Sequence, residues 1–479
     1  MAIQENTLIA SDIEEYLKQH ENKELLRFIT CGSVDDGKST LIGRLLHDSK
    51  MIFEDQLAAI NKDSKKHGTT GEEVDLALLV DGLQSEREQG ITIDVAYRFF
   101  ATDKRKFIIA DTPGHEQYTR NMATGASTAD LAIILIDARY GVQTQTRRHS
   151  YITNLLGMKH IVVAVNKMDL VDFSEQRFEE IVAEYTAFAK ELGIENPIFC
   201  PVSALTGDNV VNPSDKMSWF SGQPLMSLLD TIEIGDNTDL EHFRFPVQYV
   251  NRPHLDFRGF CGTIAAGEIA VGDEITVLPS MKTSTVKQVV VPAVDLASME
   301  AEKAFAPMAV TLTLNDEIDI SRGDMIVKSS DVPEVADQLE VMVVWMNEAA
   351  MRPNTDYLIK RATNVTTGRF VGIDHKVDVN TLETEEANKL ELNEIAQCHL
   401  QLNQMISFDP YSAIKGTGSF IVMDKYTNAT LAAGMIVGKS SVESAAIARD
   451  YSPFEKDLNV LIRQHFPEWG CKSIDEVLN

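Results

Sequence analysis

A glycine-rich segment that ends in lysine and serine is the first part of the sequence that predicts chemistry. It reads Gly32-Ser-Val-Asp-Asp-Gly-Lys-Ser39, follows an apolar run and precedes a helical pattern over Thr40–Leu46. Such a loop points backbone N–H groups at phosphates, and the helix N-terminus adds positive potential. We expect Lys38 to reach the terminal phosphates and Ser39 to bind Mg²⁺. An ordinary glycine-rich turn is the alternative, but it requires neither the Lys-Ser pair nor this spacing.

A second segment, Asp111-Thr-Pro-Gly-His115, follows another apolar run and supplies charges around the same metal. Asp111 is expected to hold Mg²⁺ through water, and the Gly114 amide to contact a γ-phosphate. Thr92 is the candidate residue that completes the metal shell only when the γ-phosphate is present. His115 is placed to orient the attacking water. The alternatives are a turn-forming aspartate, a β-branched strand residue and a structural histidine.

The segment Asn166-Lys-Met-Asp169 follows a further apolar run and predicts a guanine site. The Asp169 carboxylate can accept from guanine N1–H and the N2 amino group, whereas adenine has no hydrogen at N1. We expect the Lys167 stem to lie over the base and Asn166 to tie its loop to the phosphate loop. In Ser203-Ala-Leu205, the Ala204 amide is expected to donate to guanine O6.

These motifs define a predicted site. The residues expected to act in hydrolysis are His115, Lys38 and Thr92. The residues expected to bind Mg²⁺ are Ser39, Thr92 and Asp111. The residues expected to contact GTP are Gly32, Ser33, Val34, Asp35, Asp36, Gly37, Lys38, Ser39, Thr40, Asp111, Thr112, Pro113, Gly114, His115, Asn166, Lys167, Met168, Asp169, Ser203, Ala204 and Leu205.

The hydrophobic pattern, which predicts the elements that position these residues, changes along the chain. Residues 1–240 alternate buried apolar runs with amphipathic stretches, which predicts an α/β P-loop domain with a mostly parallel sheet and helices on both faces. A capping-box spacing at Ser11–Glu14 predicts a leading helix. Short alternating stretches predict two all-β barrel domains, over residues 241–335 and 336–479, the second ending in a short helical tail. The string YSAIKG is expected to be one of the barrel strands.

Composition excludes several classes of protein. The net charge of −28 and pI of about 4.8 disfavour a nucleic-acid partner, because the field repels phosphate backbones. The N-terminus shows no secretory pattern, and no uncharged apolar run approaches the ~20 residues of a membrane span. Five scattered cysteines without C-x-x-C spacing favour reduced thiols in a cytoplasmic protein.

The motifs together resemble the translation-factor-type GTPases, the superfamily of elongation factor Tu, over about residues 25–440. The resemblance rests on three strings. They are Glu86-Arg-Glu-Gln-Gly-Ile-Thr-Ile-Asp94, Asp111-Thr-Pro-Gly-His115 and Asn121-Met-Ala-Thr-Gly125. It implies two barrels after the GTP-binding domain, a switch role for Thr92 and a water-positioning role for His115.

Within that superfamily the chain is similar to the GTPase subunits of bacterial sulfate adenylyltransferases. Asp36 stands where elongation factors usually carry His or Ser, and four longer strings resemble those subunits. They are Ile136–Val142, Gln145–Ser150, Phe245–Pro253 and Leu255–Gly259. The resemblance implies a smaller partner subunit that binds ATP and sulfate, in a heterodimer or higher assembly. It implies that GTP hydrolysis is coupled to formation of adenosine 5′-phosphosulfate and pyrophosphate in sulfate assimilation.

Three other interpretations have to be weighed, the first of which is a plain regulatory switch, although two added barrels are more than a minimal switch requires. An elongation-factor-like protein that carries aminoacyl-tRNA has the same motifs, and a basic cleft would favour it. A second phosphate loop at Gly434–Ser440 would indicate a fused kinase, but it has three residues between the glycines instead of four. We interpret this segment as the end of a barrel strand and a turn.

Overall fold

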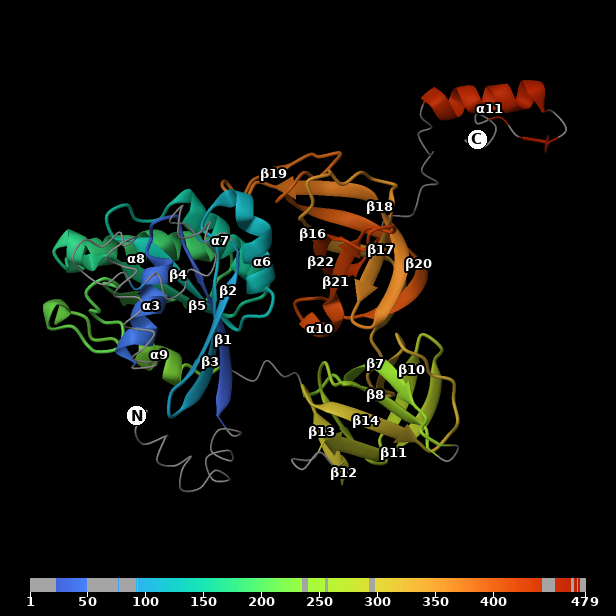
Figure 1. The fold of residues 1–479 in the computed structure, drawn as a ribbon, viewed down its shortest axis with the longest axis horizontal. Helices are drawn as coiled ribbons and strands as arrows, with labels where there is room; N and C mark the ends of the chain where they lie inside the picture. Colours follow the sequence, from blue (N-terminus) through green and yellow to red (C-terminus); the bar gives the residue numbers. More distant parts are fainter. Residues whose placement is uncertain are drawn as a thin grey trace. The chain divides into compact units, whose positions relative to one another are not determined.

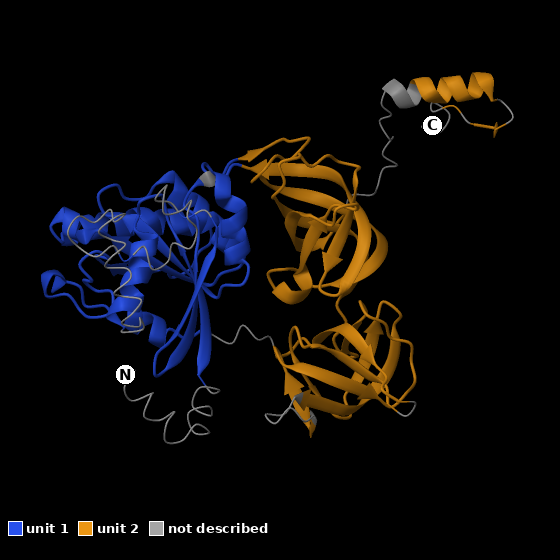
Figure 2. Ribbon diagram, in the orientation of Figure 1, with its two compact units in different colours: residues 1–237, 378–383 blue, residues 238–377, 384–479 orange. Residues whose placement is uncertain are grey.

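A computed structural model of the chain describes residues 23–49, 76, 92, 94–234, 240–254, 257–292, 298–441, 453–466, 469–471 and 473. The chain divides into two compact units (Figure 2), which are residues 1–237 with 378–383 and residues 238–377 with 384–479. The leading helix expected at Ser11–Glu14 lies outside the described residues. Within the described part, every helix is too short or too polar to cross a membrane.

Unit 1 is built on a six-stranded sheet (Figure 1) with the strand order β2-β3-β1-β4-β5-β6. Five strands are parallel, and β2 pairs antiparallel with β3 at one edge. The strands are β1 (Glu24–Cys31), β2 (Ala96–Ala101), β3 (Arg105–Asp111), β4 (Leu131–Asp137), β5 (His160–Asn166) and β6 (Ile198–Pro201). Every residue of β4 is buried, as in a strand covered on both faces. The predicted sheet is confirmed, and β2 is an addition to it.

Helices cover both faces of this sheet (Figure 1). One face carries an apolar core in which side chains of α3 and α9 pack against alternate residues of the strands, such as Leu26, Phe28 and Phe107. Contacts of α6 and α7 with the central strands cover the opposite face. The helices of unit 1 are α3 (Lys38–Asp48), α6 (Thr119–Ala126), α7 (Thr144–Leu155), α8 (Glu175–Glu191) and α9 (Leu225–Thr231), with 3-10 turns η2 (Glu116–Tyr118), η3 (Met168–Val171) and η4 (Asp215–Met217).

Unit 2 contains two antiparallel barrels, which confirms the predicted fold class. The first is closed by pairing of β10 with β11 and the second by pairing of β17 with β18. The first barrel has β7 (Arg244–Asn251), β8 (Gly259–Thr263), β9 (Glu268–Ala270), β10 (Glu274–Leu278), β11 (Lys282–Pro292), β12 (Ser298–Ala301), β13 (Lys303–Phe305), β14 (Ala309–Leu314) and β15 (Met325–Lys328). The second has β16 (Glu334–Trp345), β17 (Asp356–Arg361), β18 (Asn364–Val377), β19 (Thr384–Glu385), β20 (Ile395–Phe408), α10 (Lys415–Gly418), β21 (Ser419–Met423) and β22 (Thr430–Lys439).

Three sequence predictions in this unit have different outcomes. The segment Gly434–Ser440 lies in β22 and its end, as predicted, so it forms no phosphate loop. The tail contains the helix α11 (Pro453–His465). The strand expected at Tyr411–Gly416 is wrong, because this segment forms a turn that leads into α10. Tyr411 N–H still donates to Ile436 O at 2.8 Å, but the N–H groups of Ala413 and Ile414 donate to Pro410 O at 2.9 and 3.0 Å, which turns the chain away from the barrel ladder.

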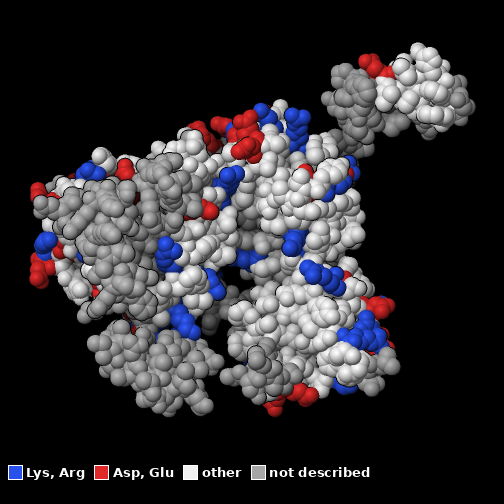
Figure 3. Space-filling model, viewed as in Figure 1, with Lys and Arg blue, Asp and Glu red and all other residues white. Residues whose placement is uncertain are grey.

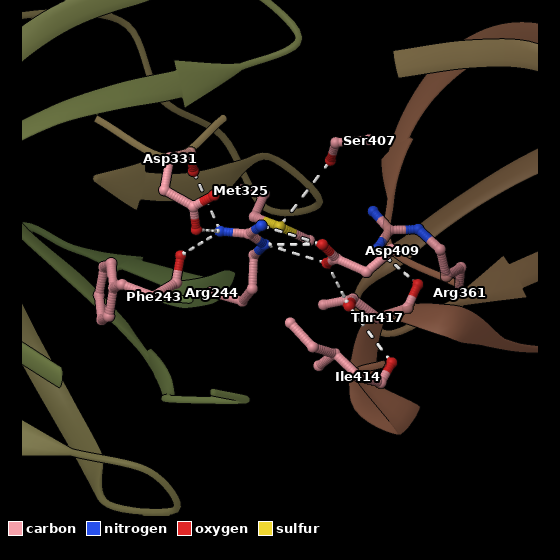
Figure 4. A network of polar contacts seen from close by, with 9 residues as sticks. All are labelled: Phe243, Arg244, Met325, Asp331, Arg361, Ser407, Asp409, Ile414 and Thr417. Atoms are coloured by element: carbon pink, nitrogen blue, oxygen red, sulfur yellow. Dashed lines mark hydrogen bonds and ion pairs between the residues drawn. The ribbon is translucent and has the colours of Figure 1, made fainter. Parts of the chain in front are cut away.

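A buried ionic network joins the two barrels (Figure 4). Arg244, at the start of β7, is 2% exposed and donates from Nε and Nη2 to the Asp409 carboxylate at 2.9–3.1 Å. Its Nη1 donates to Asp331 Oδ2 at 2.8 Å. The Thr417 hydroxyl donates to Asp409 Oδ2 at 2.6 Å, and Arg361 lies on the far side of this carboxylate. Burial lowers the pKa of Arg361 to about 10, although Asp409 opposes this shift.

Candidate functional site

The predicted phosphate loop connects β1 to α3. Gly37 caps the N-terminus of α3 with φ of 89°, a left-handed conformation that glycine adopts without strain. A Cβ at Gly37 would lie 2.7 Å from Asn166 Nδ2, so glycine is also required for space. Asp35 is left-handed as well, with φ of 67°. The loop therefore has the tight backbone that its glycines predict, with the helix N-terminus directly behind it.

Lys38 lies inside this loop and is 7% exposed. Its Nζ donates to the carbonyl oxygens of Gly32 at 3.2 Å and Ser33 at 2.8 Å. Burial lowers the Lys38 pKa, while the nearby Asp111 carboxylate acts in the opposite direction. Gly114 lies beside the ammonium group, because a Cβ there would be 2.7 Å from Nζ. The structure thus brings the phosphate lysine and the Gly114 turn together.

The three predicted magnesium ligands converge on one point next to Lys38. Ser39 Oγ donates to Asp111 Oδ2 at 2.7 Å and lies 3.4 Å from Thr92 Oγ1. The other carboxylate oxygen, Asp111 Oδ1, accepts from the Thr30 hydroxyl at 3.0 Å. Two hydroxyls and one carboxylate are hard oxygen donors of the kind that Mg²⁺ prefers. The residues present therefore fit a magnesium ion with substrate phosphates.

His115 follows the Gly114 turn and is partly exposed. Its Nδ1 accepts the Gln117 backbone N–H at 3.3 Å, and its ring centroid lies 6.0 Å from that of Tyr118. A neutral imidazole that accepts at Nδ1 carries its proton on Nε2. In this arrangement Nε2–H is a donor, which suits orientation of a water molecule.

The predicted link between the base loop and the phosphate loop is present as a pair of hydrogen bonds. Asn166 Nδ2 donates to Asp36 O at 2.7 Å, and Asn166 Oδ1 accepts from the Ala204 N–H at 2.9 Å. Asn166 is 1% exposed, so both bonds are buried. The Ala204 amide, expected to donate to guanine O6, is therefore already engaged by Asn166 in this structure.

Asp169 and Lys167 are also tied to neighbouring loops. The Ser203 hydroxyl donates to Asp169 Oδ1 at 2.6 Å, which orients the carboxylate. Lys167 Nζ donates to the Asp35 carbonyl and lies 3.0 Å from Asp137 Oδ2. Burial alone would raise the Asp137 pKa, but hydrogen bonds from Arg139 and Lys167 lower it overall. The Lys167 side chain thus crosses from the base loop to the phosphate loop.

The remaining predicted contacts serve mainly to support these loops. The Thr112 hydroxyl donates to Thr30 O at 2.6 Å, and Leu205 O accepts from Arg44. Pro113 and Met168 are buried, Thr40 lies in the first turn of α3, and Val34 is exposed.

Sequence reasoning missed Thr30, Asp137 and His149 as members of the site. Asp137 ends a fully buried strand, as Asp111 does, and that position was a usable signal. Thr30 has no such signal, because it lies inside an apolar strand and its bond to Asp111 spans 81 residues.

The comparisons with known proteins agree with the fold. The family described as "Elongation factor Tu GTP binding domain" matches residues 23–235, and "GTP-eEF1A C-terminal domain-like" matches residues 338–437. The chain is 67% identical over 467 residues to sulfate adenylyltransferase subunit 1 of Aliarcobacter butzleri (strain RM4018), covering 97% of this chain and 98% of that protein. It is 62% identical over 477 residues to the subunit 1 of Sulfurovum sp. (strain NBC37-1), covering 98% and 99%.

A solved structure of sup35 complexed with GDP covers 90% of this chain and 98% of its own, at 22% identity and a TM-score of 0.40, which is too distant to carry an argument. Identity of 62–67% over nearly the whole of both chains, by contrast, is decisive. The chain belongs to the sulfate adenylyltransferase subunit 1 family and carries a GTP-binding domain of the elongation factor Tu type.

Proposed function

We propose that this chain binds GTP with Mg²⁺ and hydrolyses it as one subunit of a sulfate adenylyltransferase. The observation that carries the GTP assignment is the convergence of Lys38, Ser39 and Asp111 at one end of the phosphate loop. Asp169, oriented by Ser203, supports the choice of guanine. All of these residues come from loops at the carboxyl ends of parallel strands, where α/β sheets bind ligands.

Each residue has a defined task in this proposal. Lys38 exchanges its two carbonyl acceptors for phosphate oxygens and neutralises their charge. Ser39, Asp111 and Thr92 hold the Mg²⁺, which stabilises charge on the phosphates when it is bound. His115 orients the attacking water through Nε2–H. The reaction is GTP and water to GDP and phosphate.

The sulfate assignment rests on relatives that carry the name sulfate adenylyltransferase subunit 1. We infer a smaller adenylyltransferase subunit as partner, which binds ATP and sulfate and forms adenosine 5′-phosphosulfate and pyrophosphate. Formation of that mixed anhydride is unfavourable, so a second hydrolysis reaction has to supply free energy. Thr92 lies 3.4 Å from Ser39, and we infer that a γ-phosphate at the metal signals to the partner through this threonine.

The aminoacyl-tRNA carrier is the alternative that the test must exclude. On the face seen in Figure 3, lysine and arginine side chains lie in small separate groups, and the acidic groups lie mostly toward the margins. The net charge of −28 favours a protein partner over an RNA backbone.

The test measures GTP hydrolysis by the chain alone, with the purified smaller subunit, and with that subunit plus ATP and sulfate. We expect full stimulation only in the complete mixture, together with GTP-dependent adenosine 5′-phosphosulfate. Hydrolysis that ignores the smaller subunit, combined with recovery of tRNA or ribosomes from cell extract, would refute the proposal.

The variant Asp169→Asn tests whether the hydrolysed nucleotide binds to this chain. An amide at this position can pair with xanthine but not with the guanine N1–H and N2 amino pair. We expect the complete mixture with this variant to lose its response to GTP and to regain it with xanthosine triphosphate. Stimulation by GTP that survives unchanged would show that the nucleotide acts elsewhere.

A further inference from the structure

A buried imidazole lies directly under the phosphate loop. His149, on α7, is 3% exposed, and its Nδ1 accepts the Gly32 backbone N–H at 3.1 Å. The two residues are separated by 117 positions in the sequence. His149 lies in one of the strings that supported the family resemblance, but the proposed reaction uses it for nothing. A histidine that only filled the core would not need an acceptor atom aimed at this one amide.

The protonation state of His149 makes it an acceptor. Burial, with the nearby positive charges of Lys38 and Arg148, lowers its pKa to about 3. The ring is therefore neutral at physiological pH, and Nδ1 offers a lone pair to the Gly32 N–H. Lys38 and Arg148 are the charged groups that act on the ring, and both oppose its protonation.

The first two residues of the phosphate loop, Gly32 and Ser33, are held by hydrogen bonds on both their carbonyl and their N–H groups. Their carbonyl groups, on Gly32 and Ser33, accept from Lys38 Nζ. Their N–H groups donate away from the lysine, Gly32 to His149 and Ser33 to the Asp36 carboxylate. Before nucleotide binds, four hydrogen bonds therefore set the direction of two successive residues, and the two made by the N–H groups remain when Lys38 turns to phosphate.

We propose that His149 is a positioning residue for nucleotide binding, which holds the entry of the phosphate loop in its binding conformation through the Gly32 N–H. The proposal rests on the proposed GTP function, because it concerns the same loop. It assigns to α7 a task that is separate from packing. Without the acceptor, the Gly32 N–H is left unpaired in a buried place, and the loop rearranges to satisfy it. Nucleotide binding then has to restore the original loop.

The test uses two variants at His149 and a matched control on the same helix. His149→Leu keeps a bulky side chain but has no acceptor. His149→Asn keeps an acceptor, Oδ1, on the same Cγ position as Nδ1. The control is Ser150→Ala, which removes buried hydrogen bonds to Tyr185 OH at 2.9 Å and Thr146 O at 2.8 Å but none to the phosphate loop.

We expect His149→Leu in the full-length chain to weaken GDP and GTP alike by about tenfold, since an unpaired buried N–H is worth this much in binding. His149→Asn should bind within about threefold of the unaltered chain on the same reasoning. Ser150→Ala should lower the melting temperature and leave both dissociation constants unchanged. Affinity that follows melting temperature across all three variants, with no rescue by asparagine, would show a structural role only and overturn the proposal.

Hydrogen exchange in the unaltered, nucleotide-free chain tests the same contact without a variant. The Gly32 amide should exchange slowly, because it is bonded to His149 before any ligand binds. Exchange at the rate of an exposed amide would overturn the proposal even where His149→Leu does not fold. An unaltered chain that binds neither GDP nor GTP would refute the proposed function as well, whereas normal binding by His149→Leu would refute only the role of His149.

Discussion

Removal of the Asp409 carboxylate is expected to destabilise the two barrels by about 3–5 kcal/mol, the cost of breaking a buried ion pair from one side. The carboxylate accepts from Arg244 Nε and Nη2 and from the Thr417 hydroxyl. In Asp409→Ala, the buried Arg244 keeps the Phe243 carbonyl and one carboxylate, Asp331, which is itself partly exposed. Arg361 loses the anion that opposes its desolvation. Arg244 would then keep one carboxylate, Asp331 at 2.8 Å, while Arg361 would lose the carboxylate beside it.

Removal of Arg244, the other partner of this ion pair, should lower the free energy of unfolding by less. In Arg244→Met, Asp409 keeps the Thr417 hydroxyl and still has the positive charge of Arg361 beside it. The methionine also fills part of the space of the arginine stem. We therefore expect Arg244→Met to cost about half as much as Asp409→Ala, because a neighbouring charge remains to compensate only in that case.

The assay is urea unfolding of the full chain followed through Trp345, which is 1% exposed in the second barrel. Trp219 and Trp469 are changed to phenylalanine in all variants, so the signal comes from this barrel alone. Glu391→Ala, which breaks an exposed pair with Lys389, is the matched control and should leave the midpoint unchanged. A midpoint for Asp409→Ala equal to that of the control, or an Arg244→Met that costs more than Asp409→Ala, would refute this reasoning.

Two further predictions concern the phosphate loop. Burial raises the Asp36 pKa to about 6, despite the opposing charges of Lys38 and Lys167. Between about pH 4 and 6 the Asp36 carboxyl is therefore protonated in the folded chain and ionised in the unfolded chain. The stability that the protonated Asp36 carboxyl contributes is lost as pH rises through 6. Asp36→Asn should therefore raise the melting temperature more at pH 8 than at pH 5. Melting temperatures of the variant and the unaltered chain that change in parallel with pH would contradict this. Gly114→Ala should weaken GTP binding by at least about tenfold, because its Cβ would lie 2.7 Å from Lys38 Nζ. Gly438→Ala, where a Cβ meets nothing within 4 Å, is the control, and equal affinity of the two variants would contradict the clash.

The parts of the fold that the sequence predicted are those with a local signal. The parallel strands appear as apolar runs, and the motif loops follow β1, β3 and β5 directly, so these strands have a local signal in the sequence. The strand β2 carries no comparable run. Its residues alternate, with Phe100 buried and Phe99 71% exposed, and only its pairing with β3 defines it.

The candidate site shows the same division between local and distant information. The residue types in the phosphate loop predicted that its N–H groups and Lys38 would surround a phosphate. They did not predict that the Gly32 N–H belongs to His149, because that bond spans 117 residues. The loop at Tyr411–Gly416 was taken for a strand since its composition alternates, but the N–H groups of Ala413 and Ile414 bond locally to Pro410 O and form a turn. A sequence pattern predicts a strand only where the backbone N–H groups of that segment are not already bonded within a turn.

The base pocket shows why residue type alone does not assign a role to an atom. Asn166 was expected to join two loops, and it does so with both side-chain atoms, to Asp36 O and to the Ala204 N–H. The same bond takes up the Ala204 amide that was expected to meet guanine O6. Ser203, by contrast, was expected only as part of a short motif, and its hydroxyl orients the Asp169 carboxylate. In a site built from loops on separate strands, a ligand can bond only to atoms that neighbouring loops have not already bonded. Which atoms stay available here depends on hydrogen bonds between residues 34–130 positions apart in the sequence.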